Sequence, residues 1–215
     1  TALAMDRVDD ACELGQSAAQ REPENPDAFL FLCHVLDLKN QPREALEALE
    51  AASPAVRQNF SVAFERARLI RDLHGPKAAL ETLERLAQDY PDEPDLLAFL
   101  ARTQAECGDM RMAERHAFKA LRLNPNQPDL ALMLGRMQRK SGQLDQSVHL
   151  LSEAVRMAPR QLEAYLELGS VYQDRREFDQ ALQIYRQAIR NAPRDYQAYY
   201  QSGIILRDSK DYSGS

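Results

Sequence analysis

The chain has 215 residues, of which 44% are hydrophobic and 28% charged, with a formal net charge of −6. Abundant Ala, Leu, Glu, Gln and Arg, with only eight glycines, favour helix over strand. The acidic balance argues against non-specific nucleic-acid binding, which needs a positive surface. The sequence contains no run of about 18 apolar residues, so no membrane-inserted segment is expected.

No charged and apolar leader is visible at the N-terminus, and a cytoplasmic location is expected. Because the chain opens at Thr1 rather than at Met, a leader or an upstream segment could have been removed.

A period of 34 residues runs through the chain and is marked by prolines at Pro91, Pro125, Pro159 and Pro193. We number the positions of each unit as slots, starting from Pro26. Slot 8 is always small: Cys33, Ala67, Ala101, Gly135, Gly169 and Gly203. Slot 20 is also small: Ala45, Ala79, Ala113, Ser147 and Ala181. A recurring unit of this length predicts a repeat protein.

The period predicts the elements in chain order. Residues 1–25 are expected to form the second helix of an incomplete repeat. Five full units are expected over residues 26–195, namely 26–59, 60–93, 94–127, 128–161 and 162–195. Residues 196–212 are then the first helix of a further, truncated repeat, and residues 213–215 a tail. About eleven helices are expected in all.

Each full unit is predicted to be a pair of helices. Slots 4, 7, 8 and 11 form an i, i+3, i+4, i+7 stripe, which is one face of a helix. A second stripe begins at slot 20, as at Ala181 and Leu182. Small residues at slots 8 and 20 would let the two backbones approach closely. Since one pair cannot bury its own apolar face, successive pairs must stack.

The unit 162–195 resembles the tetratricopeptide repeat (TPR) family at Tyr165, Leu168, Gly169, Tyr172, Ala181, Tyr185, Ala188 and Pro193. The other units match less closely, since Gln104 and Gln138 stand where the family prefers Tyr. The resemblance implies an all-α, right-handed superhelical solenoid of antiparallel helix pairs. It also implies a concave groove, lined by the first helices, that binds other proteins.

In the family, slots 2, 5, 6, 9, 12 and 13 of the first helix point into this groove. Here they carry cations and apolar side chains that would suit an acidic, extended partner polypeptide. The candidate binding residues are Arg68, Phe99, Arg102, Leu132, Met133, Arg136, Arg139 and Lys140.

The competing interpretation is that these arginines are solvated, or neutralised along their own helix. Arg68 has Asp72 four residues on and Arg102 has Glu106, whereas Arg136 has Lys140 at that spacing. If the cations bind the partner, the double substitution Arg136→Glu, Arg139→Glu should abolish binding.

The last predicted helix carries an apolar stripe that includes Tyr196 and four candidate self-association residues: Tyr199, Tyr200, Ile204 and Ile205. Either the chain is a fragment of a longer array whose next helix covers the stripe, or two chains dock there.

No catalytic motif is present, and no cofactor or metal site is expected. The four histidines lie in different units without metal-ligand spacing, and the three cysteines, Cys12, Cys33 and Cys107, form no CxxC. The sequence therefore predicts a non-catalytic scaffold for protein–protein interaction. The alternative is a substrate-recruiting or regulatory arm of a larger enzyme. The Lys/Asn clamp of chaperone-tail adaptors is missing, and RNA binding is disfavoured by the acidic charge.

Overall fold

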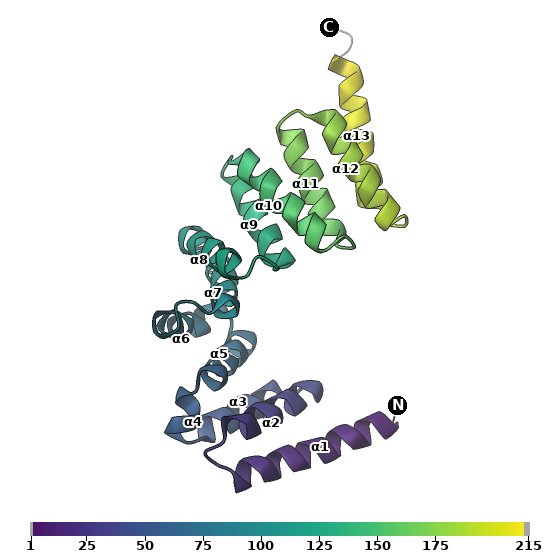
Figure 1. Ribbon diagram of the computed structural model, residues 1–215. Coiled ribbons are helices and arrows are strands. Elements are labelled where there is room, and N and C mark those ends of the chain that lie inside the picture. Colours follow the sequence, from purple (N-terminus) through teal and green to yellow (C-terminus); the bar gives the residue numbers. More distant parts are fainter. Residues whose placement is uncertain (1, 213–215) are drawn as a thin grey trace. The chain divides into compact units, whose positions relative to one another are not determined.

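The computed structural model describes residues 2–212, and their side chains over residues 7–207. Every regular element in that range is an α-helix (Figure 1). The first helices of successive units are α2 (Pro26–Leu38), α5 (Phe60–His74), α7 (Pro94–Glu106), α9 (Pro128–Lys140), α11 (Leu162–Asp174) and α13 (Tyr196–Tyr212). The second helices are α1 (Ala2–Arg21), α3 (Pro42–Ala51), α6 (Pro76–Asp89), α8 (Met110–Leu123), α10 (Leu144–Met157) and α12 (Phe178–Asn191).

A short helix, α4 (Pro54–Gln58), lies between α3 and α5 and was not expected from the sequence. The part of the chain that the structure describes thus holds thirteen helices, where about eleven were predicted. The predicted units themselves contain twelve, and α4 is the thirteenth. The predicted tail at 213–215 lies outside the described residues.

The chain forms two compact parts, which we call the N-terminal part (up to Asp109) and the C-terminal part (from Met110). The boundary between them lies in the turn between α7 and α8, inside the predicted unit 94–127. Each part buries its own apolar clusters, one of which contains Leu83, Leu96 and Leu100 and another Leu151, Leu168 and Val171.

Local sequence explains where the helices begin and turn. Proline is the first residue of α2, α3, α4, α6, α7 and α9, where its missing N–H costs no intrahelical hydrogen bond. Slot 15 follows the first helix and has a positive φ at Asn40, Gly108, Gly142 and Arg176. This left-handed residue reverses the chain between the two helices of a unit.

Close packing at slots 8 and 20 confirms the expected role of the small residues there. The Ser147 hydroxyl donates to the carbonyl oxygen of Gly135 at 2.7 Å, and the Cys33 sulfur lies 3.7 Å from the carbonyl oxygen of Ala45. Both contacts join slot 8 to slot 20, and all four residues are buried. A longer side chain at either slot would push the two helices apart.

Slot 11 is polar in two units, where the side-chain N–H group donates to a carboxylate of the preceding unit. The buried amide of Gln104 donates to Glu84 at 3.2 Å, and that of Gln138 donates to Glu114 at 2.7 Å. These hydrogen bonds allow Gln to stand where the repeat pattern prefers Tyr, because a buried amide N–H needs a partner.

Among the described residues, no helix combines the length and the apolar character that a membrane crossing requires.

Candidate partner-binding face

The arginines at slots 9 and 12 of α9 are tied to the next first helix, α11. Arg136 Nη2 lies 2.5 Å from Glu163 Oε1, and Arg136 Nε lies 2.9 Å from Glu167 Oε1. Partial burial lowers the pKa of Arg136, but the hydrogen bond to Glu163 and the charge of Glu167 outweigh burial and raise it overall. Arg136 therefore stays charged, with its guanidinium directed along α11.

Arg139 makes a second set of ion pairs to the same helix. Its Nε lies 2.6 Å from Asp174 Oδ2, and its Nη1 lies 3.3 Å from Glu167 Oε2. The hydrogen bond to Asp174 raises the pKa of Arg139 further than partial burial lowers it. Glu167 thus bridges Arg136 and Arg139, and the three residues form a network rather than separate pairs.

These pairs differ from both interpretations of the sequence. The arginines of α9 are neither free nor neutralised along their own helix, because their partners come from the following unit. Sequence reasoning missed Glu163, Glu167 and Asp174. The signal that could have found them is an offset of one period, since slot 12 of one unit pairs with slot 13 of the next.

Lys140 is the exception in this cluster. Slot 13 carries an acid in the neighbouring units, at Glu106 and Asp174, but a lysine here. The Lys140 side chain is exposed, and its ammonium makes no ion pair with any residue whose side chain is described. It lines an open cavity of about 550 Å³ together with Arg136, Arg139, Glu167 and Asp174. Three cations and two carboxylates thus meet around one cavity.

The predicted cations of the N-terminal part are arranged differently. Arg68 donates two hydrogen bonds to the Glu65 carboxylate, from Nε at 3.0 Å and from Nη2 at 2.7 Å. These hydrogen bonds raise the pKa of Arg68. Arg102 is half-buried and forms no ion pair among the described side chains. Its expected partner, Glu106, pairs instead with Arg71.

The predicted apolar anchors are accessible to different degrees. Leu132 is only 4% exposed and packs in the core, so it does not offer the free surface that the sequence suggested. Met133 is half-buried on α9. Phe99 is also half-buried, with its ring 4.9 Å below the Arg71 guanidinium and edge-on to Phe64. Leu132 at slot 5 therefore packs in the core, whereas Phe99 and Met133 at slot 6 are still partly accessible to solvent.

The predicted self-association residues on α13 are partly exposed and partly buried. Tyr199 and Tyr200 are exposed, at 49% and 63%, and Ile204 is half-buried. Ile205 was expected on the open stripe, but it is 1% exposed because it packs against Ala181 and Tyr185 of α12. The exposed apolar surface of this helix is therefore tyrosine-rich and lacks Ile205.

No group of three or more His, Cys, Asp or Glu side chains comes together, within the described range, in a way that could hold a metal ion. We call the surface around the Lys140 cavity the α9–α11 face; its residues are Met133, Arg136, Arg139, Lys140, Glu163, Glu167 and Asp174. It offers ion pairs beside one half-buried apolar side chain, Met133.

A family model described as tetratricopeptide repeat matches residues 2–64 and 138–202, which together make up more than half of the chain. A comparison with curated proteins gives no significant match.

Solved structures match over most of the chain. YrrB, described as a TPR protein with an unusual peptide-binding site, is 18% identical over 90% of this chain and 100% of its own, with a TM-score of 0.73. MamA from Desulfovibrio magneticus RS-1 is 21% identical over 72% and 88%, with a TM-score of 0.65. The Cut9–Hcn1 structure is 18% identical over 95% of this chain but 40% of the matched chain, with a TM-score of 0.72. At these identities the likeness concerns the fold.

Proposed function

Because the chain belongs to the tetratricopeptide repeat family, we propose that it is a non-catalytic scaffold that binds a partner polypeptide on the α9–α11 face. The observation that carries this proposal is the cavity of about 550 Å³ at which Lys140 stands without an ion-pair partner beside Arg136 and Arg139. An extended segment with acidic side chains fits this charge pattern.

The ion pairs between α9 and α11 favour binding rather than prevent it. They hold the guanidinium groups in place before the partner arrives, so less side-chain entropy is lost on binding. The Arg139 side chain is 31% exposed, so a carboxylate of the partner can approach it from the solvent side. Lys140 supplies a charge that no carboxylate of the described residues already neutralises.

Charge contacts alone do not explain a useful affinity. A micromolar complex requires about 8 kcal/mol, whereas an exposed ion pair contributes roughly 0–1 kcal/mol. The partner therefore needs apolar side chains as well. Half-buried Met133, at slot 6 of the same helix as Lys140, is the candidate residue for them to contact. An acidic segment interrupted by leucine or phenylalanine meets both needs.

The second candidate is a recruiting or regulatory arm within a larger protein. What supports it is that the same fold also occurs within longer chains, since the match to Cut9–Hcn1 covers only 40% of that chain. For either candidate we propose the division of residues 26–195 into five full units. The sequence of the complete gene would separate the two candidates, because an arm would be followed or preceded by a catalytic domain.

The test begins with an array of extended peptides in which Glu and Asp alternate with Leu or Phe. The tightest peptide is titrated by fluorescence anisotropy against the wild-type chain and Lys140→Glu. Arg190→Glu is the matched control, since Arg190 is an exposed cation on α12 away from this cavity. We expect Lys140→Glu to weaken binding about tenfold and the control to change it little. Equal weakening by both variants, or no binding of any acidic peptide, would refute the proposal.

A further inference from the structure

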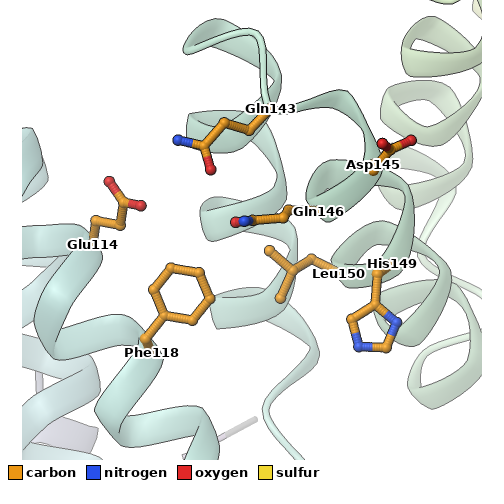
Figure 2. A pocket seen from close by; sticks show the side chains of 7 residues that line it. All are labelled: Glu114, Phe118, Gln143, Asp145, Gln146, His149 and Leu150. Atoms are coloured by element: carbon orange, nitrogen blue, oxygen red, sulfur yellow. The ribbon is translucent and has the colours of Figure 1, made fainter.

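A second open cavity lies in the C-terminal part, between the second helices α8 and α10 (Figure 2). Its volume is about 600 Å³, and it is lined by Glu114, Phe118, Gln143, Asp145, Gln146, His149 and Leu150. Figure 2 shows Glu114 and Phe118 on one side, with Gln143, Gln146 and Leu150 facing them from the other. None of these residues belongs to the α9–α11 face.

The charge of this cavity is opposite to that of the Lys140 cavity. Two carboxylates, Glu114 and Asp145, line it, and no lysine or arginine does. Asp145 is 92% exposed and lies 3.2 Å from Arg175, which partly neutralises it. The negative charge directed at a bound group is therefore chiefly that of Glu114.

Glu114 is held in place by a buried group. The Gln138 amide, which is fully buried, donates to Glu114 Oε1 at 2.7 Å. Glu114 Oε2 accepts no hydrogen bond from the residues whose side chains are described, so it is available to a donor. Gln138 Oε1, beside the same hydrogen bond, is buried and has no hydrogen-bond partner. The cavity wall thus presents a fixed carboxylate, in which Oε1 already accepts a hydrogen bond from Gln138 and Oε2 can accept one from a bound group.

Apart from the two carboxylates and the exposed imidazole of His149, the walls are apolar or amide in character. The half-buried ring of Phe118 and the side chain of Leu150 give the cavity an apolar surface, and Gln143 and Gln146 are exposed at its opening. A carboxylate beside an aromatic face matches a guanidinium, which donates several hydrogen bonds in one plane and stacks on aromatic rings. A lysine ammonium is a compact, strongly hydrated charge and gains less from such a wall.

We propose that this α8–α10 cavity binds an arginine side chain of a partner polypeptide. The guanidinium donates to Glu114 Oε2 and lies against Phe118, and the aliphatic stem of the arginine contacts Leu150. The Gln143 and Gln146 amide oxygens accept the remaining N–H groups. This second site takes basic segments, whereas the α9–α11 face takes acidic ones, so the scaffold can hold two chemically different segments at once.

The test uses short labelled peptides that carry a single central arginine in a serine and leucine background. Citrulline, which has nearly the shape of arginine without its charge, replaces arginine in the matched peptide. Binding is followed by ¹H–¹⁵N NMR on the full chain, which locates the site as well as measuring affinity. We expect the arginine peptide to shift the amide signals of Glu114, Phe118, Gln146 and Leu150, and to bind at least tenfold more tightly than the citrulline peptide.

Glu114→Gln is the decisive variant, because its side-chain oxygen can still accept from Gln138 while the charge is lost. It should weaken the arginine peptide about tenfold. Glu153→Gln, the same change on α10 outside the cavity lining, should leave affinity within twofold. Equal binding of arginine and citrulline peptides, no shift at any of the four residues, or shifts confined to Glu167 and Asp174 would each overturn the proposal. Lysine peptides that bind as tightly as arginine peptides would overturn the stacking on Phe118.

Discussion

Arg139 and Asp174 stand at slots 12 and 13 of successive repeats and form an ion pair with 2.6 Å between Nε and Oδ2. Arg71 and Glu106, two repeats earlier, occupy the same slots and are paired as well. In both cases an arginine of one first helix reaches the C-terminal end of the next first helix. The recurrence identifies a rule of inter-repeat pairing within each part of the chain.

This pair should contribute modestly to stability. A double-mutant cycle of Arg139→Ala and Asp174→Ala can be measured by urea denaturation. We expect a coupling free energy of about 0.5–1 kcal/mol in unfolding, because both side chains are partly exposed. The coupling should fall at high salt. The exposed pair Glu153–Arg156 within α10 is the control, with about 0.2–0.5 kcal/mol expected. A coupling for Arg139 no larger than the control's would show that the inter-repeat network has no special role.

Two glycines at the same slot should respond oppositely to alanine. A Cβ on Gly169 would come within 2.6 Å of Cζ in the buried Tyr185 ring, whereas a Cβ on Gly203 would meet nothing within 4 Å. Gly169→Ala should lower the free energy of unfolding by about 1–3 kcal/mol. Gly203→Ala should raise it by about 0.5–1 kcal/mol, because alanine is the better helix former. Chemical denaturation measures both, and destabilisation of equal size in the two variants would contradict the close approach at Gly169.

The three thiols should react at very different rates. Burial, reinforced by the charge of Glu65, raises the pKa of Cys33 to about 12 from a usual value of 9.0. Cys12 is buried as well, whereas Cys107 is half-buried at the end of α7. A thiol-alkylating reagent at neutral pH should therefore modify Cys107 first, with Cys33 protected until the chain unfolds. Mass spectrometry of tryptic fragments would show this order, and early labelling of Cys33 would contradict its burial.

The raised pKa also has a consequence for stability. A thiol whose pKa is higher in the folded state favours folding fully below pH 9, and this contribution is lost as pH rises toward about 12. Cys33→Ala should remove this part of the alkaline loss of stability.

Self-association through α13 predicts a dimer whose population depends on concentration. The exposed rings of Tyr199 and Tyr200 would supply the contact, and Tyr200→Glu should abolish it. A conservative change at buried Ile205, such as Ile205→Val, should leave the dimer intact. Sedimentation velocity decides this, since a monomer at the highest concentration rules out the docking of two chains.

The sequence predicts the fold closely because the repeat signal is redundant. Slots 8 and 20 must be small in every unit, so Ser147 and Gly135 report the same packing constraint as Cys33 and Ala45. Helix α4 lacks such redundancy, since Pro54 and Val56 occur once and their local pattern of five residues is too short to show a period.

The candidate site was harder to predict, because burial and pairing depend on neighbouring repeats. Helical spacing alone suggests Glu106 as the partner of Arg102, but Glu106 pairs with Arg71, 35 residues earlier. The same reasoning places Leu132 on an accessible face, although the adjacent repeat buries it. A helical pattern identifies the faces of one helix, whereas contacts between helices also require the offset between repeats.

The central claim is that an acidic, extended polypeptide lies along α9 and α11. The most direct measurement is photo-crosslinking with the tightest acidic peptide, carrying a benzophenone group that reacts readily with methionine. Mass spectrometry should place the main crosslink at Met133 of α9, and excess unlabelled peptide should suppress it. Crosslinks confined to the second helices α10 and α12, with none on α9 or α11, would contradict the claim.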